Sequence, residues 1–349
     1  MSMEKDTLEG VKDYYGKILK GSKDLKTSAC CTTETLPLRI REILKDLHTE
    51  VLDKFYGCGS PIPPDLTGRT VLDLGSGSGR DCYVLSKIVG PSGSVIGVDM
   101  TDEQLEVARR HIDYHTGKFG YSKPNVEFRK GFIEDLEGAG IASNSVDTVV
   151  SNCVLNLSPN KKRVFSEIFR VLKPGGELYF SDVFSDRRIP KELASDRVMV
   201  GECLGGALYL EDFRRLLAGL GCLDVRVISK TKIALNNAEI ERKAGMIGFY
   251  SVTVRAFKLD LEDRCEDYGQ VAYYLGTIPE CPHSFTLDDH HVFKKGLPML
   301  VCSNTAAMLA ETRFSEHFKI VGDTTTHYGL FDCGPKPSVT GGAAPGACC

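Results

Sequence analysis

Short apolar runs alternate with helical patterns along residues 65–225. The runs have the length of buried strands, whereas the segments between them repeat apolar residues at three- and four-residue spacing. The predicted strands are 70–74, 94–98, 126–130, 145–150 and 177–182, and the predicted helices are 80–88, 101–115, 161–172 and 210–220. Strands that alternate with helices in this way favour an α/β fold, a doubly wound and mostly parallel sheet.

The first 64 residues have a different pattern and predict an N-terminal helical segment. Apolar residues recur near helical spacing over 11–20 and 38–55, and the segment from Gly57 to Pro61 then breaks the pattern. Cys58 therefore falls on a turn. Within the alternating region, Thr101 stands three residues before Gln104, as in a capping box, and predicts one helix that begins there and runs to about residue 115.

After about residue 225 the alternation stops. Two predicted strands, 251–259 and 270–278, flank a polar stretch, and a helix is expected over 304–311. We interpret residues 226–330 as a smaller α+β domain. Residues 331–349 are rich in Gly, Pro, Ala and Ser and end in two cysteines, so we expect a flexible tail that cannot bury enough apolar surface to offset its ordering entropy.

Composition narrows the class of protein. A chain of 349 residues with a formal net charge of −4 has no basic surface for a nucleic-acid backbone. It has no apolar run long enough to cross a membrane and no secretory signal, which predicts a cytoplasmic protein. The 13 cysteines are then expected to be mostly thiols. No long apolar helix is left over for an interface, so a monomer is expected.

A glycine-rich loop follows the first predicted strand and opens the first helix. Gly75, Gly77 and Gly79 let the backbone turn tightly and approach a ligand, and their GxGxG spacing departs from the GxGxxG of dinucleotide sites. Asp99 ends the second strand, where a carboxylate can accept both ribose hydroxyls of an adenosine. Glu134 follows the third strand, where an acid can contact adenine.

Together with the block 172–178, these segments resemble the class I S-adenosylmethionine-dependent methyltransferases over residues 68–225. The resemblance implies that the glycine loop borders the methionine part of the cofactor, that Asp99 binds the ribose, and that the third-strand segment binds adenine. The cofactor-binding candidates are Asp73, Gly75, Gly77, Gly79, Asp99, Met100, Ile133, Glu134 and Asn152.

Cysteines occupy the region where the methyl acceptor is expected. Ligands bind beyond the carboxyl ends of the strands, and the fourth strand is followed there by Cys153. The Asn/Asp-Pro-Pro-aromatic motif of many amine methyltransferases is absent from this position. Cys203 lies in the glycine-rich segment 201–207 and Cys58 on its turn, so both could approach Cys153. Taken singly, each cysteine also fits a small, buried apolar residue.

Several of these segments are similar to the arsenite methyltransferase family, above all the run Gly-Glu-Cys-Leu-Gly-Gly-Ala-Leu-Tyr at 201–209. The resemblance covers nearly the whole chain. It implies that Cys58, Cys153 and Cys203 bind trivalent arsenic, and that Cys30 pairs with Cys58 in redox steps, although the neighbouring Cys31 leaves that role open. It also implies arsenite and methylated arsenicals as substrates, thioredoxin or glutathione as reductant, and a part in detoxification.

The chemistry agrees with this resemblance. Arsenic(III) is soft and prefers thiolates, by the argument that applies to thiophilic metals. Its lone pair can attack a sulfonium methyl without a general base. Two alternatives stay open, a small-molecule carbon or oxygen methyltransferase with structural cysteines and a non-catalytic arsenic-binding protein. We interpret Cys265, Cys302 and Cys333 as structural or incidental, because no motif surrounds them, and His290 and His291 as surface residues.

Overall fold

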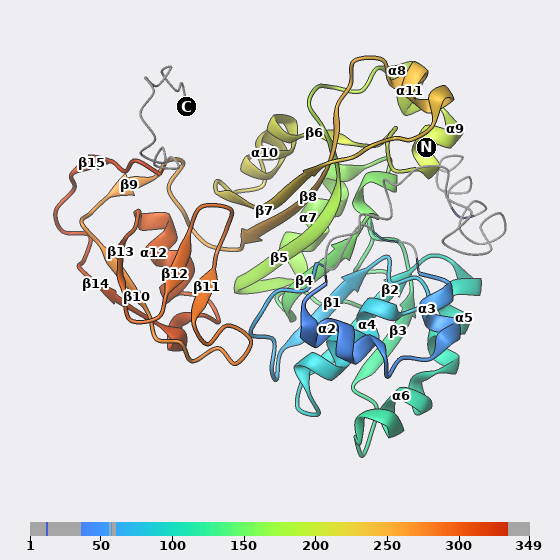
Figure 1. Ribbon diagram of the computed structural model, residues 1–349, viewed down its shortest axis with the longest axis horizontal. Helices are drawn as coiled ribbons and strands as arrows, with labels where there is room; N and C mark the ends of the chain where they lie inside the picture. Colours follow the sequence, from blue (N-terminus) through green and yellow to red (C-terminus); the bar gives the residue numbers. More distant parts are fainter. Residues whose placement is uncertain (1–11, 13–35, 56, 58–60, 334–349) are drawn as a thin grey trace.

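The computed structural model describes residue 12, residues 36–55, residue 57 and residues 61–333. Its centre is an eight-stranded sheet in the order β3-β2-β1-β4-β5-β8-β7, with β6 paired to β5 (Figure 1). The strands are β1 (Thr70–Leu74), β2 (Ser94–Asp99), β3 (Val126–Lys130), β4 (Val146–Asn152), β5 (Leu172–Ser185), β6 (Leu208–Tyr209), β7 (Val225–Lys232) and β8 (Phe249–Phe257). Strands β1 to β5 pair in parallel, whereas β8 runs antiparallel to both β5 and β7.

Helices cover both faces of this sheet, which confirms the predicted doubly wound α/β architecture. One apolar cluster joins the sheet to α7 and α10 through Phe165 and Phe213, and a second joins it to α2, α4 and α5 through Ile43, Leu85 and Leu105. The helices of this part are α2 (Leu38–Leu44), α3 (Thr49–Asp53), α4 (Arg80–Val89), α5 (Asp102–Arg110), α6 (Ile112–Phe119), η3 (Leu155–Leu157), α7 (Lys161–Val171), α8 (Lys191–Ala194), α9 (Arg197–Gly201), α10 (Leu210–Ala218) and α11 (Ala238–Ala244).

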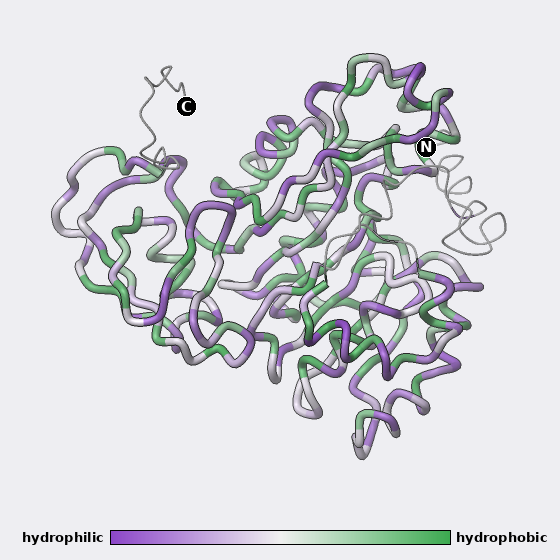
Figure 2. Tube along the Cα trace, viewed as in Figure 1, coloured by the Kyte–Doolittle hydropathy of each residue, from purple (hydrophilic) through white to green (hydrophobic). Residues whose placement is uncertain are grey.

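The helices are amphipathic, and Figure 2 shows hydrophobic and hydrophilic positions alternating along those around the sheet. Within the described part of the chain, none of the helices combines the length and the apolar character that crossing a membrane would require.

The helix predicted over 101–115 is two helices. The backbone of His111 leaves helical geometry between α5 and α6, and its Nε2 atom lies 2.7 Å from Oε2 of Glu50. The predicted capping box is also wrong, because the Thr101 side chain makes no capping hydrogen bond. Instead the Thr101 amide donates to Oδ1 of Asp99, which ties the start of α5 to the end of β2.

The main sheet continues past residue 225, where we predict the first domain to end. Strand β8 pairs with β5 from Glu177↔Phe257 to Ser185↔Phe249, and β7 extends the same sheet. The strand predicted over 251–259 therefore belongs to the main sheet and not to the smaller domain. Sequence pattern identifies a strand but not its partner, because pairing depends on residues distant in the chain.

The remaining elements form a smaller α+β unit, drawn in orange to red beside the main sheet in Figure 1. They are β9 (Glu266–Asp267), β10 (Val271–Tyr274), β11 (Ser284–Thr286), β12 (Val292–Lys294), β13 (Pro298–Leu300), α12 (Ser303–Ala310), η4 (Ser315–His317), β14 (Phe318–Val321) and β15 (Gly329–Leu330). Glu177 of β5 is fully buried and forms ion pairs with Arg255 of β8 and with Arg313, which follows α12. These pairs link the unit to the sheet.

Candidate active site

The glycine-rich loop between β1 and α4 has the backbone that its glycines predict. Gly75, Gly77 and Gly79 have φ values of 73°, 52° and 88°, a region that other residues rarely adopt. A Cβ atom on Gly75 would lie 2.4 Å from Cγ2 of Val154, and one on Gly79 would lie 2.7 Å from Cζ of Phe128. The loop is thus packed closely against its neighbours, and its peptide groups border the space above the sheet.

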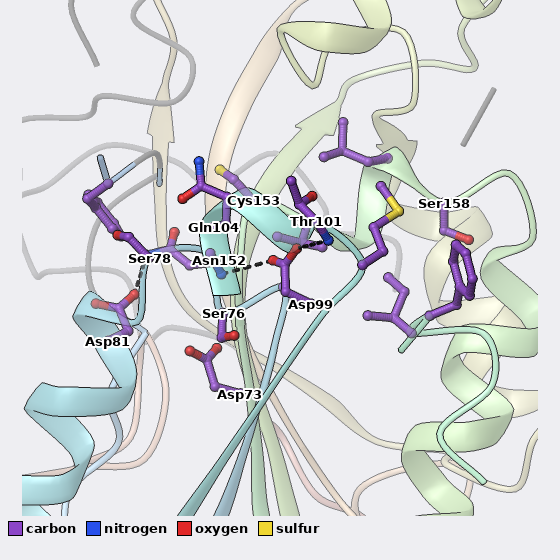
Figure 3. Close-up of a pocket in the computed structure, with 18 of the residues that line it drawn as sticks. Asp73, Ser76, Ser78, Asp81, Asp99, Thr101, Gln104, Asn152, Cys153 and Ser158 are labelled. Carbon is purple, nitrogen blue, oxygen red and sulfur yellow. Dashed lines mark hydrogen bonds between the residues drawn. The ribbon is translucent and has the colours of Figure 1, made fainter. Parts of the chain in front are cut away.

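A pocket lies at the carboxyl ends of β1, β2 and β4, as the strand order predicts (Figure 3). Most of the residues that we proposed for cofactor binding line it, together with one of the proposed arsenic ligands. They are Asp73, Gly75, Gly77, Asp99, Met100, Ile133, Glu134, Asn152 and Cys153. Gly79 and Cys203 do not line the pocket. Gly79 is the N-cap residue of α4, and Cys203 contacts Cys153.

Asp99 is held at the mouth of the glycine loop by backbone donors. Its Oδ2 atom accepts a hydrogen bond from the Gly77 amide at 2.9 Å and its Oδ1 atom one from the Thr101 amide at 2.8 Å (Figure 3). Burial raises the pKa of Asp99, and these backbone donors oppose the rise. The arrangement fixes the carboxylate in the lining of the pocket.

Asp73 lies deeper in the same pocket. Burial, and after it the charge of Asp81, raise the pKa of Asp73 to about 8, and the Cys82 thiol donates to its Oδ2 atom at 3.2 Å. Nearby, the Ser76 hydroxyl is buried without a hydrogen-bond partner among the described residues. A nearby cation would stabilise the ionised form of Asp73, and the Ser76 hydroxyl is available for a hydrogen bond. These two groups would suit the charged amino-acid end of S-adenosylmethionine.

Cys153 and Cys203 meet beside this pocket. The Cys203 thiol donates to the carbonyl oxygen of Cys153 at 3.4 Å, and both residues are buried in one apolar cluster that includes Met199. Both have left-handed backbones, with φ values of 57° and 61°. Such strain in non-glycine residues concentrates at functional sites. Cys153 is disulfide-bonded in this structure, so its sulfur becomes available to a ligand on reduction.

The other proposed thiols, Cys30, Cys31 and Cys58, lie outside the described residues. The N-terminal helices themselves contact the cofactor loop. The Ser78 hydroxyl donates to the carbonyl oxygen of Val51 in α3 at 2.9 Å, and Phe55 lines the pocket under the guanidinium of Arg80. The sequence pattern placed no residue of this segment in the cofactor pocket, because Phe55 reads as an ordinary apolar helix position.

The sequence pattern did not predict a polar network around Lys161, which lies close in the chain to Cys153. The Lys161 amino group donates to the carbonyl oxygens of Asn156 at 3.1 Å and Ser158 at 3.0 Å. Burial lowers the pKa of Lys161, whereas the negative charge of Asp182 opposes that change. Burial raises the pKa of Asp182 to about 7. A lysine at the start of a helix is usually solvated, so no sequence pattern indicated a role for this position.

Comparison with known proteins identifies the family. A methyltransferase-domain model matches residues 66–240, and the model of the arsenite methyltransferase C-terminal domain matches residues 267–340. Arsenite methyltransferase from Aquipseudomonas alcaligenes is 53% identical over 93% of this chain and 94% of its own length, and the Homo sapiens enzyme is 45% identical over 89% and 82%. The chain belongs to the arsenite methyltransferase family.

A solved structure supports the same assignment. The crystal structure of an arsenic(III) S-adenosylmethionine methyltransferase from Chlamydomonas reinhardtii is 52% identical, with a TM-score of 0.83 over 86% of this chain and 100% of that one. As a member of the arsenite methyltransferase family, the protein is an S-adenosylmethionine-dependent methyltransferase. The resemblance, fold class and cofactor predicted from the sequence are thereby confirmed.

Proposed function

We propose that the protein methylates trivalent arsenic, as arsenite and as methylated arsenicals, with the metalloid bound by the thiolates of Cys58, Cys153 and Cys203. The observation that carries this proposal is the meeting of Cys153 and Cys203. Their atoms approach to 3.4 Å at the wall of the cofactor pocket, although the residues come from the end of β4 and from the loop after α9.

The residues of the pocket would hold the cofactor by its three parts. Asp73 and the glycine loop would hold the methionine end, Asp99 the ribose, and Met100, Ile133 and Glu134 the adenine, with Asn152 at the wall between them. When bound, S-adenosylmethionine supplies an activated methyl group on a sulfonium. Asn152 is itself positioned by a 3.0 Å hydrogen bond from its amide to Oδ2 of Asp81.

The thiolates position arsenic so that its lone pair points toward the methyl carbon. The lone pair would become the new arsenic–carbon bond as the bond between the sulfonium sulfur and the methyl carbon breaks. The electron pair of the broken bond stays on sulfur, so S-adenosylhomocysteine leaves as a thioether. No proton leaves the nucleophile, so the mechanism requires no general base. Alignment of the two reactants can contribute about 7–11 kcal/mol. Arsenic is formally oxidised by two electrons in this step. Two thiolates that join in a disulfide return those electrons, and thioredoxin or glutathione then restores the thiols by exchange.

Cysteine-to-serine variants test the arsenic ligands directly. Cys153→Ser and Cys203→Ser should lose arsenite methylation while keeping S-adenosylmethionine binding, and arsenic X-ray absorption should show fewer sulfur neighbours than in the wild type. Cys222→Ser is the matched control, since Cys222 is also buried but lies in a different apolar cluster. Retained arsenite methylation in either ligand variant would overturn the proposal.

The redox cysteines are tested with a second substrate. If Cys30 and Cys58 act in an early step, their serine variants should fail with arsenite and still methylate a monomethylated arsenical. The same change at Cys31 decides which member of the Cys30–Cys31 pair takes the role. Methyl transfer to a quinone or sterol precursor, without any to arsenite, would instead favour the carbon or oxygen methyltransferase.

A further inference from the structure

Three cysteines of the smaller unit converge far along the chain from the proposed active-site thiols. The Sγ atoms of Cys265, Cys302 and Cys333 all lie within 4.8 Å of one another, and all three are free thiols. The sequence suggested no common role for them, because they are dispersed and no motif surrounds them. None of the three lines the cofactor pocket.

Strand pairing and a helix start produce this convergence. Cys265 immediately precedes β9 and Cys333 closely follows β15, and the two strands pair through Leu330↔Glu266. The pairing continues beyond the strands, where the Phe331 amide donates to the carbonyl oxygen of Cys265 at 2.8 Å. Cys302 is the N-cap residue of α12. The geometry therefore depends on the tertiary fold, and the spacing of the cysteines in the sequence does not reveal it.

The surroundings of Cys302 favour a thiolate. Its sulfur accepts a hydrogen bond from the Thr305 amide at 3.4 Å, lies 3.2 Å from the Thr305 hydroxyl, and is 4.0 Å from Nη2 of Arg226. Hydrogen bonds from the Cys265 and Cys333 thiols, with these donors, lower the pKa of Cys302. The pKa of Cys265 is raised to about 11 by its hydrogen bond to Cys302.

Two of the three cysteines are partly exposed to solvent. Cys302 is fully buried, whereas Cys265 and Cys333 are each partly exposed. The cluster is therefore not sealed inside the core of the smaller unit.

We propose that Cys265, Cys302 and Cys333 form a second binding site for trivalent arsenic, separate from the active site. Three sulfurs match the coordination of arsenic(III), whose lone pair takes the fourth position. Structural zinc sites need four protein ligands, and the group of candidate ligands within reach among the described residues has only these three members. Binding is ligand exchange: each sulfur replaces one hydroxyl of arsenious acid. The hydroxyl leaves as water with the proton of a thiol, or as hydroxide where the sulfur is already a thiolate, and no electrons are transferred.

The bound arsenic would be a link between β9, α12 and β15. It stabilises the smaller unit, because a ligand that binds only the folded state shifts the unfolding equilibrium. None of the three cysteines lines the cofactor pocket, so arsenic bound to them would not be methylated there. The site adds binding capacity to the protein and does not depend on the ligands proposed for catalysis.

Arsenic stoichiometry tests this site in the full-length chain. The starting protein carries Cys348→Ser and Cys349→Ser, so that the terminal pair contributes no binding. Arsenite is added under reducing conditions, free arsenic is removed by gel filtration, and bound arsenic is counted by mass spectrometry. Cys265→Ser or Cys333→Ser should remove one arsenic per chain, because each leaves two sulfurs. These two partly exposed positions are chosen over the buried Cys302 so that the variants fold.

Cys281→Ser is the matched control, a partly exposed free cysteine of the same unit outside the cluster, and it should keep the wild-type stoichiometry. Adding Cys153→Ser and Cys203→Ser should leave one arsenic with three sulfur neighbours by X-ray absorption. Adding Cys333→Ser to that protein should then remove the remaining arsenic. Equal stoichiometry with and without Cys333 overturns the proposal, and so does one zinc per purified chain that arsenite does not displace. Arsenite methylation by the Cys333→Ser variant should match the wild-type rate, which separates this test from that of the active-site ligands.

Discussion

The thiol of Cys203 donates to the carbonyl oxygen of Cys153 across 3.4 Å, although the two residues are 50 positions apart in the chain. Close packing between the loop after α9 and the 3-10 helix η3 makes this contact. A Cβ atom on Gly206 would lie 1.9 Å from the carbonyl oxygen of Asn156 in η3, so only glycine allows the loop to approach this far.

Gly206→Ala should therefore move the two cysteines apart without changing the cofactor pocket. We expect arsenite methylation to fall by at least about 100-fold, since a displacement near 1 Å at a reacting centre can cost that much. S-adenosylmethionine binding, measured by calorimetry, should remain, because Gly206 does not line the pocket. Gly117→Ala in α6 is the control: nothing lies near its Cβ position, and alanine favours a helix. Normal methylation by Gly206→Ala would contradict the role given to this contact.

Local pattern predicted the parts of the fold that depend on local physics. The strands at 70–74 and 126–130 begin and end where expected, because short apolar runs between turn residues leave few other choices. The glycine loop and Asp99 could also be predicted, because each lies in one short segment whose residue types already indicate its chemistry. The approach of Cys203 to Cys153 was suggested by position alone, and its basis in Gly206 appears only in three dimensions.

Lys161 is expected to position residues 154–158, the segment that joins Cys153 to α7. Lys161→Met would leave the carbonyl oxygens of Asn156 and Ser158 without their donor, which should lower the free energy of unfolding by about 1–3 kcal/mol. It should also reduce kcat for arsenite more than it raises KM for S-adenosylmethionine. Lys162→Met is the matched control, since Lys162 is exposed on the next position of the same helix. Urea unfolding and steady-state rates measure both effects; identical behaviour of the two variants would argue against a positioning role.

Asp73 should couple cofactor binding to pH. Burial and the charge of Asp81 raise its pKa from 3.8 to about 8, so it is mostly protonated at pH 7. A cationic amino group bound beside it would favour the ionised form, so binding at pH 7 should release a proton and tighten as pH rises toward 8. Calorimetry in two buffers with different ionisation enthalpies measures this release. Asp73→Asn should bind more weakly and release no proton there; equal proton release by both proteins would contradict the assignment.

The same carboxyl gives a stability signature in the cofactor-free enzyme. Its pKa is higher in the folded state than in the unfolded chain, so its stabilising contribution is complete below about pH 4 and is lost as pH rises through about 8. Relative to wild type, Asp73→Asn should therefore gain stability steadily between pH 4 and pH 8, with no further gain above. Thermal unfolding across that range measures the difference between the two proteins.

Residues whose role depends on distant partners were beyond sequence reasoning. His291, which we interpreted as a surface residue, is buried, and its Nδ1 atom lies 2.9 Å from Asp288, which in turn pairs with Arg226 of β7. The cysteines of the smaller unit likewise looked incidental until β9 paired with β15. In each case the neighbours that give the residue its environment come from another element, and no local pattern encodes that proximity.

Glu177 should be the most sensitive single position at the junction of the sheet and the smaller unit. Its side chain is completely buried between Arg255 and Arg313, which also donate to the carbonyl oxygens of Leu287 and Pro64. Glu177→Gln leaves two buried guanidinium groups without their counter-charge, and removing one partner of a buried pair typically costs about 3–5 kcal/mol. We expect a loss of that size in urea unfolding at pH 7.

Glu211→Gln provides the comparison, because Glu211 pairs with Arg214 in an exposed i,i+3 arrangement that water screens. Its effect should be far smaller. S-adenosylmethionine affinity should survive in the folded fraction of Glu177→Gln, since Glu177 does not line the pocket. If the Glu177 variant unfolds at the same urea concentration as the Glu211 variant, the two arginines are stabilised by their carbonyl acceptors alone, and the carboxylate is not what links the smaller unit to the sheet.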